Sequence, residues 1–258
     1  YDHTVSGSNA GPDQSLCTPI TTTTMAANAP GAPAQGTWTL VSGSGTITSL
    51  HSPNTTITGL GIGENIFRWD VSNGPCPVNP PNDQVSIFVY DVNAPVAQAG
   101  PDQQLCTPTL STSLAGNAAV APGIGTWTVI TGTGTFANSH NPTTVVSGLS
   151  VGTNTLRWTL NNGPCANPVT NDDVAIVVFN GANAVANAGP DQQLCRPTTS
   201  TTLSGSALSA PATGQWTQVS GSGTIVSPSS PTTQVTGLAT GNNIFRWTVT
   251  NGPCANGL

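Results

Sequence analysis

The chain contains no lysine, and its cationic side chains are four arginines: Arg68, Arg157, Arg196 and Arg246. Charged residues make up 5% of its 258 residues and leave a net charge of −6, whereas an average soluble domain has roughly 25% charged residues. Because nucleic acid binding needs clustered lysine and arginine, this composition excludes a nucleic acid partner. It also excludes a polybasic membrane contact and, without lysine, any Lys–Asn isopeptide crosslink. Solubility must come from neutral polar side chains.

Long apolar runs and catalytic motifs are missing too. No apolar stretch approaches the roughly 18 residues that a membrane span needs, and no basic start followed by an apolar stretch opens the chain. We therefore expect no membrane insertion in this segment. The histidines are His3, His51 and His140, and no GxSxG, HExxH or phosphate-binding loop is present. The expectation is a protein without enzymatic activity, catalytic residues or cofactor.

What the chain does contain is one unit, repeated every 89 residues. The segment AGPDQSLC at 10–17 returns as AGPDQQLC at 99–106 and 188–195. The aligned residues are Cys17, Cys106 and Cys195; Cys76, Cys165 and Cys254, each in NGPC; Trp38, Trp127 and Trp216; and Trp69, Trp158 and Trp247. A fixed period of this kind predicts a tandem array. The predicted domains are copy 1 (1–93, with 1–4 the tail of a preceding copy), copy 2 (94–182) and copy 3 (183–258), which lacks its last strand.

Each copy shows the alternation of β-strands and no helical period. In copy 2 we expect strands over 93–106 (broken at Gly100-Pro101), 107–115, 125–130, 143–149, 154–160 and 173–179. Asn162-Gly163 is predicted to supply the positive φ angles of a hairpin turn. A unit of this size fits a small β-sandwich. With short joins at 91–97 and 180–186, the prediction is an all-β, rod-like array of sandwiches.

Copy 3 has no equivalent of QVSIFVY at 84–90 or DVAIVVF at 173–179. We expect its preceding strand to present an open, labile edge to another strand. That strand would come from a continuation of the array or from a neighbouring chain.

Two cysteines per copy indicate disulfides and an oxidising, extracytoplasmic location rather than a metal site, because no CxxC occurs. We predict pairing within each copy, namely Cys17–Cys76, Cys106–Cys165 and Cys195–Cys254. The alternative is a ladder between neighbouring copies, such as Cys76–Cys106.

Tryptophans and isolated charges recur at fixed positions. Trp69, Trp158 and Trp247 are interpreted as core residues, since Trp69 shares a strand face with Phe67 and Val71. Trp38, Trp127 and Trp216 are also assigned to the core, but the strand pattern around them is less regular, so a sugar-stacking role is a closer alternative for them than for the Trp69 series.

The recurring charges predict structural ion pairs Asp13–Arg68, Asp102–Arg157 and Asp191–Arg246, with turn capping by the aspartates as the rival interpretation. Calcium is not favoured, because Asp91 in the first join is replaced by Asn180 in the second.

The combination AGPDQ-x-LC, GxW, VxGLxxGxNxxRWTxxNGPC and a VxI strand resembles the PKD-like and immunoglobulin-like repeats of giant gliding-motility-associated surface adhesins exported by the type IX secretion system. Copy 1 departs at Ile57 and Asp70. The resemblance implies an immunoglobulin/PKD-like fold and an extracellular, cell-surface filament without catalytic residues.

The function expected from the resemblance is to space an adhesive end and transmit force to it. The partners would be further copies in the same polypeptide and neighbouring copies in a fibre. One alternative is an array of weak binding modules for surface glycans. Another is the stalk of a secreted polysaccharide-degrading enzyme.

Overall fold

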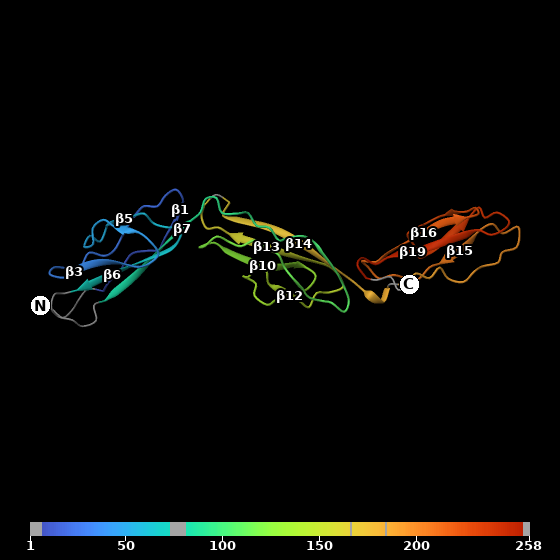
Figure 1. Ribbon diagram of the computed structural model, residues 1–258, viewed down its shortest axis with the longest axis horizontal. Helices are drawn as coiled ribbons and strands as arrows, with labels where there is room; N and C mark the ends of the chain where they lie inside the picture. Colours follow the sequence, from blue (N-terminus) through green and yellow to red (C-terminus); the bar gives the residue numbers. More distant parts are fainter. Residues whose placement is uncertain (1–6, 73–80, 166, 184, 255–258) are drawn as a thin grey trace. The chain divides into compact units, whose positions relative to one another are not determined.

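The computed structural model describes residues 7–72, 81–165, 167–183 and 185–254 (Figure 1). These residues form nineteen β-strands and one 3₁₀ helix, η1 (Gly181–Asn183), and none of their helices could span a membrane. The prediction of an all-β tandem array of β-sandwiches is confirmed. The chain forms two compact units: residues 94–98, 116–126 and 158–172 of copy 2 belong with copy 1, and the rest of copy 2 belongs with copy 3.

Copy 1 contains two sheets. Its strands are β1 (Gln14–Cys17), β2 (Thr23–Thr24), β3 (Gln35–Ser42), β4 (Thr46–Ile47), β5 (Thr56–Thr58), β6 (Gly63–Ser72) and β7 (Asn82–Tyr90). The larger sheet has the order β1-β7-β6-β3 and the smaller β2-β5-β4. β1 runs parallel to β7, whereas β6 is antiparallel to both β3 and β7.

Copy 2 repeats this arrangement. Its strands are β8 (Gln103–Cys106), β9 (Thr112–Ser113), β10 (Ile124–Thr131), β11 (Thr135–Phe136), β12 (Val145–Ser147), β13 (Gly152–Asn161) and β14 (Val169–Phe179). The larger sheet has the order β10-β13-β14-β8, and the smaller has the order β11-β12-β9. As in copy 1, the first strand of the copy, β8, runs parallel to the last, β14. The strand expected over 93–106 is shorter than predicted and begins at Gln103, beside β14.

Copy 3 keeps the smaller sheet and only part of the larger one. Its strands are β15 (Thr201–Ser204), β16 (Thr213–Ser220), β17 (Thr224–Ile225), β18 (Thr232–Thr236) and β19 (Ile244–Thr250). The order β15-β18-β17 matches the smaller sheets of the other copies, but among the described residues the larger sheet consists of β16 and β19 alone. Residues 192–195, which align with β1 and β8, form no strand.

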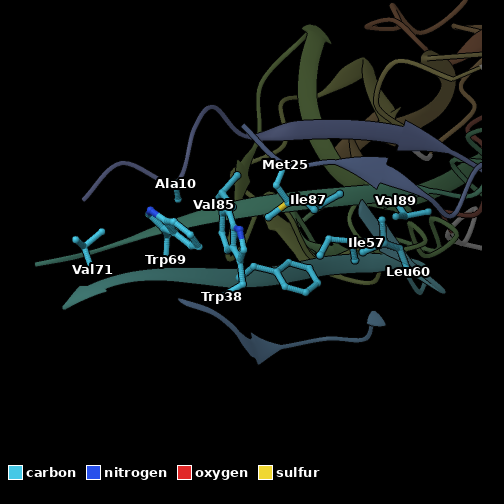
Figure 2. Packing of buried hydrophobic residues seen from close by; sticks show 11 residues of the cluster. Ala10, Met25, Trp38, Ile57, Leu60, Trp69, Val71, Val85, Ile87 and Val89 are labelled. Carbon is cyan, nitrogen blue, oxygen red and sulfur yellow. The ribbon is translucent and has the colours of Figure 1, made fainter. Parts of the chain in front are cut away.

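The core of copy 1 lies between its two sheets (Figure 2). Alternation along β6 buries Phe67, Trp69 and Val71, and alternation along β7 buries Val85, Ile87 and Val89. Trp38 lies directly opposite Trp69 in the sheet register, and the two ring centroids are 4.9 Å apart. The burial of large aromatic surface at the centre of so small a sandwich is the main source of its stability.

All six tryptophans are buried, which places the Trp38 series in the core beside the Trp69 series. Most indole N–H groups donate to main-chain oxygens across the sandwich. Trp38 donates to Ser52 O at 3.0 Å, and Trp69 donates to Asn28 O at 3.2 Å. These bonds satisfy a polar group that burial would otherwise leave without a partner.

A glycine makes room for each tryptophan of the Trp69 series. A Cβ atom on Gly36 in β3 would overlap the ring of Trp69, whereas a Cβ on Gly31 would meet nothing within 4 Å. Gly125 and Gly214 stand in the same relation to Trp158 and Trp247.

We predict that Gly36→Ala lowers the free energy of unfolding of copy 1 by about 1–3 kcal/mol, because the added methyl group overpacks the core. Gly31→Ala is the matched control and should change it by less than about 0.5 kcal/mol. Hydrogen exchange of the β6 amides measures the effect, with β13 of copy 2 as an internal reference. Equal effects of the two substitutions would contradict the packing argument.

Candidate functional site at the junctions between copies

The first and last strands of a copy end side by side. β1 and β7 run in the same direction, with Cys17 paired in register with Tyr90, and Thr18 N donates to Tyr90 O at 2.9 Å. Cys17 therefore lies at the end of copy 1 where the chain leaves for copy 2.

The NGPC turn of copy 2 reaches this end of copy 1. Cys165 is bonded to Cys17 with a Cα–Cα distance of 5.7 Å, within the usual range for disulfides. Asn162 N donates to Pro168 O at 2.7 Å, which closes the loop between β13 and β14. Gly163 has a φ of 75°, but Asn162 does not share a positive φ, so the two-residue hairpin turn predicted there is wrong. The loop is longer and displays the cysteine.

Two further contacts hold this turn in place. A Cβ atom on Gly163 would overlap the ring of Tyr90, so only glycine lets the turn lie directly on the aromatic ring. The buried Asn162 donates from Nδ2 to Pro95 O in the join at 3.3 Å. Cys165 itself is only 6% exposed. Cys17 is partly exposed, so opening of the junction would expose mainly the Cys165 side of this disulfide to a reductant.

The second junction has the same construction. Cys254 is bonded to Cys106 with a Cα–Cα distance of 5.3 Å, and Cys106 is paired in register with Phe179. A Cβ on Gly252 would overlap the Phe179 ring, and Asn251 Nδ2 donates to Asn180 O at 2.8 Å. An aromatic ring, a glycine, an asparagine and two cysteines thus recur as one set.

The prediction of disulfides within each copy is wrong. Both disulfides join neighbouring copies and span a sequence separation of 148 residues. The physical reason is strand length: Cys106 lies beside the last residue of β14, while Cys165 precedes its first residue. An eleven-residue strand separates these two positions by about 30 Å, far beyond disulfide reach.

The remaining cysteines follow from this pattern. Cys195, expected to bond Cys254, is free and exposed because Cys254 is bonded to Cys106. Cys76 lies outside the described residues. The ladder between neighbours, kept as the alternative, is the arrangement in the structure, although the pair named for it, Cys76–Cys106, does not form because Cys106 is bonded elsewhere.

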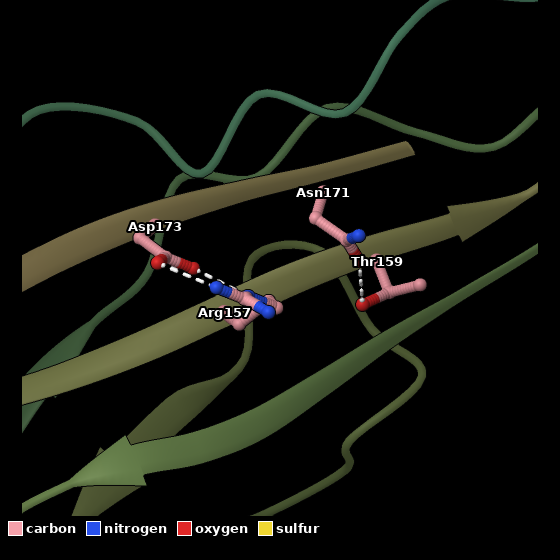
Figure 3. A network of polar contacts seen from close by, with 4 residues as sticks. All are labelled: Arg157, Thr159, Asn171 and Asp173. Carbon is pink, nitrogen blue, oxygen red and sulfur yellow. Dashed lines mark hydrogen bonds and ion pairs between the residues drawn. The ribbon is translucent and has the colours of Figure 1, made fainter. Parts of the chain in front are cut away.

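The predicted Asp–Arg pairs are also wrong. Arg68 pairs with Asp70 at 2.9 Å, and Arg157 pairs with Asp173, donating from Nε at 2.8 Å and from Nη2 at 3.0 Å (Figure 3). The hydrogen bonds from Arg157 are the main reason that the pKa of Asp173 lies below its usual value. Within the described residues Arg246 has no ion pair.

The recurring aspartates instead bind the last strand. Asp13 Oδ1 accepts from Ser86 N, and Asp102 Oδ1 accepts from Ala175 N, each at 2.8 Å. These are bonds to a neighbouring strand rather than turn caps or ion pairs. For Asp191 the described residues offer no equivalent strand.

The join residues Asp91 and Asn180 have one shared role. Asp91 Oδ1 accepts from Asn93 N at 2.9 Å, and Asn180 Oδ1 accepts from Ala182 N at 3.0 Å. An amide oxygen can replace a carboxylate oxygen in such a turn, which explains the exchange between copies. No group of three or more metal-ligating side chains occurs in the part of the chain that the structure describes.

Sequence reasoning missed Tyr90, Phe179, Asn162 and Asn251 as junction residues. Their signal was present, because an aromatic residue ends the last strand and an asparagine precedes each glycine of NGPC at the same period. The sequence did not show that the first strand of a copy runs parallel to its last strand, and this pairing is what brings these residues to the junction.

Copy 3 is similar to a known family of domains. Residues 188–256 match the family model described as K319L-like, PKD domain. No curated protein matches the chain.

Several solved structures are similar. The PKD domain of the KIAA 1837 protein is 25% identical, with 38% of this chain and 92% of that chain covered and a TM-score of 0.28. The PKD domain of human KIAA0319 is 20% identical, with 38% and 88% covered and a TM-score of 0.29. The four N-terminal immunoglobulin domains of Dscam1 are 11% identical, with 96% and 70% covered and a TM-score of 0.40.

We predict that Gly163→Ala raises the rate at which dithiothreitol reduces Cys17–Cys165 by at least about fivefold, because the methyl group forces the turn away from Tyr90. Gly148→Ala is the matched control: Gly148 has a similar φ of 69°, but its Cβ would meet nothing within 4 Å. Alkylation of the released thiols followed by peptide mass spectrometry gives the rates, with Cys106–Cys254 as the internal standard. Similar rates for both variants would mean that the Tyr90 contact does not hold the junction closed.

Proposed function

We propose that this chain is a structural segment of a long extracellular adhesin or filament, which spaces an adhesive end from the cell surface and transmits force to it. Gliding movement or surface attachment is the setting that the resemblance to type IX-exported adhesins implies. Its partners would be further copies of the same repeat in the same polypeptide and in neighbouring chains of a fibre.

The observation that carries this proposal is the overlap of the two disulfides. One spans residues 17–165 and the other 106–254, so the region 106–165 lies inside both. Each join between copies is bridged by a disulfide. Tension between neighbouring copies therefore passes through S–S bonds, which do not yield at the forces that separate packed surfaces.

Disulfides and low charge support an extracellular location. Disulfides persist in oxidising environments, and 5% charged residues with no lysine leave a neutral polar surface. PKD and immunoglobulin-like modules, to which copy 3 is similar, are structural or binding modules.

The glycan-binding alternative has less support. All six tryptophans are buried in the cores, so none of them offers the exposed ring face that stacks on a sugar. An enzyme stalk would place the same mechanical demand on these copies and would differ only in its attached domain.

Pulling the chain by its two ends should show a limit to its extension. In the oxidised chain the shortest covalent path runs through both disulfides and contains about 80 residues, so unfolding should extend it to about 28 nm, against about 90 nm after reduction. Cys106→Ser should give an intermediate length of about 38 nm, because one bridge remains. Single-molecule force spectroscopy measures these lengths. Extension of the oxidised chain to about 90 nm, or saturable binding on a glycan array, would contradict the proposed function.

Cutting the first join should leave the chain in one covalent piece. With a specific protease site inserted between Asn93 and Ala94, the cut chain should run as one species in non-reducing electrophoresis and as two fragments after reduction. Cys17→Ser should release the fragments without reductant, since Cys17–Cys165 is the only disulfide among the described residues that bridges this position. Cys106→Ser is the matched control and should retain them. Release of fragments from the unsubstituted, oxidised chain would refute the bridge.

A further inference from the structure

The outer face of the larger sheet of copy 3 carries a groove of about 230 Å³. Side chains alternate along β16 and β19, so that Trp216 and Val249 face the core and their neighbours face outward. The groove lies on this outward side, over the two paired strands. Its lining residues are Thr213, Gly214 and Gln215 of β16, Thr248 and Thr250 of β19, and Ser229 of the segment between β17 and β18.

In copy 1 a histidine ring occupies the equivalent position. His51 Nδ1 lies 2.9 Å from Gly36 O and 3.2 Å from Thr37 Oγ1. Because a main-chain carbonyl oxygen only accepts, Nδ1 carries the proton and donates it to Gly36 O. The ring therefore lies over the main chain of Gly36, beside the side chain of Thr37.

Copy 3 keeps the floor under this ring but not the ring itself. Gly214 aligns with Gly36, whereas Ser229 aligns with His51. Copy 2 retains the histidine, as His140. The serine of copy 3 thus leaves open the space that an imidazole ring fills in copy 1.

The main-chain acceptor is placed alike in the two copies. Gly36 lies opposite Val71, and Gly214 lies opposite Val249, each in an antiparallel pair. Because the register is the same, both carbonyl groups point toward the same edge of the sheet. Gly214 O is therefore positioned to accept a hydrogen bond from a ring nitrogen in the groove.

The walls of the groove favour a small, neutral ligand. Its lining side chains carry four hydroxyl groups and one amide, and none of them is charged. Copy 1 has Asp70 at the position of Thr248, so the groove of copy 3 lacks the carboxylate that would attract a cation. Its volume is below the roughly 300 Å³ at which pockets for drug-sized ligands begin. A single small ring with an N–H donor and a second polar atom fits these walls.

We propose that copy 3 is a binding site for a neutral imidazole ring, which donates its N–H to Gly214 O and accepts at its other nitrogen from a hydroxyl or amide group of the groove. The ring can belong to a small molecule or to a histidine side chain of another polypeptide, and both present the same chemistry. The inference rests on the groove of copy 3 and not on the proposed mechanical function, so either can fail without the other.

The direct test is a titration of imidazole into the isotope-labelled, full 258-residue chain, followed by NMR. At about pH 8 a ring of this kind is largely neutral. We expect saturable shifts of the Gln215 and Thr248 amides, with a Kd on the order of 1–10 mM for so small a ligand in an open groove. N-methylimidazole, which has no N–H, should bind about three- to tenfold more weakly. Equal affinities for the two ligands, or shifts that do not saturate, would overturn the proposal.

Filling the groove tests the place of binding. Ser229→His should abolish the saturable shifts, because the new ring occupies the groove as His51 occupies its counterpart in copy 1. Ser227→His is the matched control, since Ser227 lies in the same segment but does not line the groove, and this variant should bind imidazole as the unsubstituted chain does. Binding that survives Ser229→His, or equal loss in both variants, would exclude the groove as the site.

A peptide separates the two sources of the ring. The blocked peptide SLHSPN, with the sequence of residues 49–54, presents a histidine as copy 1 does. If the source is a polypeptide, SLHSPN should shift the same amides at least as strongly as imidazole, and SLASPN should not. Binding of imidazole without binding of SLHSPN assigns the groove to a small molecule. Equal shifts with the two peptides would mean that the imidazole ring is not what is recognised and would refute the proposal.

Discussion

The parallel pairing of the first and last strands of a copy is the constraint on which the rest of the structure depends. Because β1 runs with β7 and β8 runs with β14, the first cysteine of a copy lies at the end where the chain departs. The turn that carries the second cysteine lies at the opposite end, where the chain arrives. A disulfide within a copy would have to cross the length of the sheet, so the first cysteine bonds the turn of the next copy instead. Copy 3 shows the dependence directly: the described residues contain no last strand there, and 192–195 form no first strand.

Local patterns were sufficient to predict the strands that build the core. Alternation in 154–160 places Leu156, Trp158 and Leu160 on one face, and all three are fully buried. Alternation in 173–179 likewise buries Val174, Ile176 and Val178. Such strands are recognisable because one face must be apolar along its whole length, and a period of two residues records that in the sequence. The repeat itself, with its constant step of 89 residues, gave the division into copies without any reference to packing.

The junctions could not be predicted in the same way, because strand direction is a property of the whole sheet. A four-residue strand such as QQLC at 103–106 carries no local signal that says whether it runs parallel or antiparallel to its neighbour. The ion pairs failed for a related reason. Arg68 and Arg157 occupy one position, yet the first binds an aspartate on its own strand and the second an aspartate across the sheet. A fixed period identifies equivalent positions, but the partner is set by residues that differ between copies, here Asp70 and Thr159.

Copy 2 supplies a turn to copy 1 and receives one from copy 3, and this couples the stability of neighbours. The receiving end of copy 1 needs Cys17 and Tyr90, which only pairing between β1 and β7 brings together. The supplied turn needs Gly163 and Cys165 in the loop between β13 and β14. Loss of the last strand of one copy therefore removes the binding surface for the turn of the next. A modular sandwich is usually regarded as independent of its neighbours, but here the first cysteines of copies 1 and 2 are each bonded to the following copy. The smallest unit with a complete junction is consequently a pair of copies rather than a single copy.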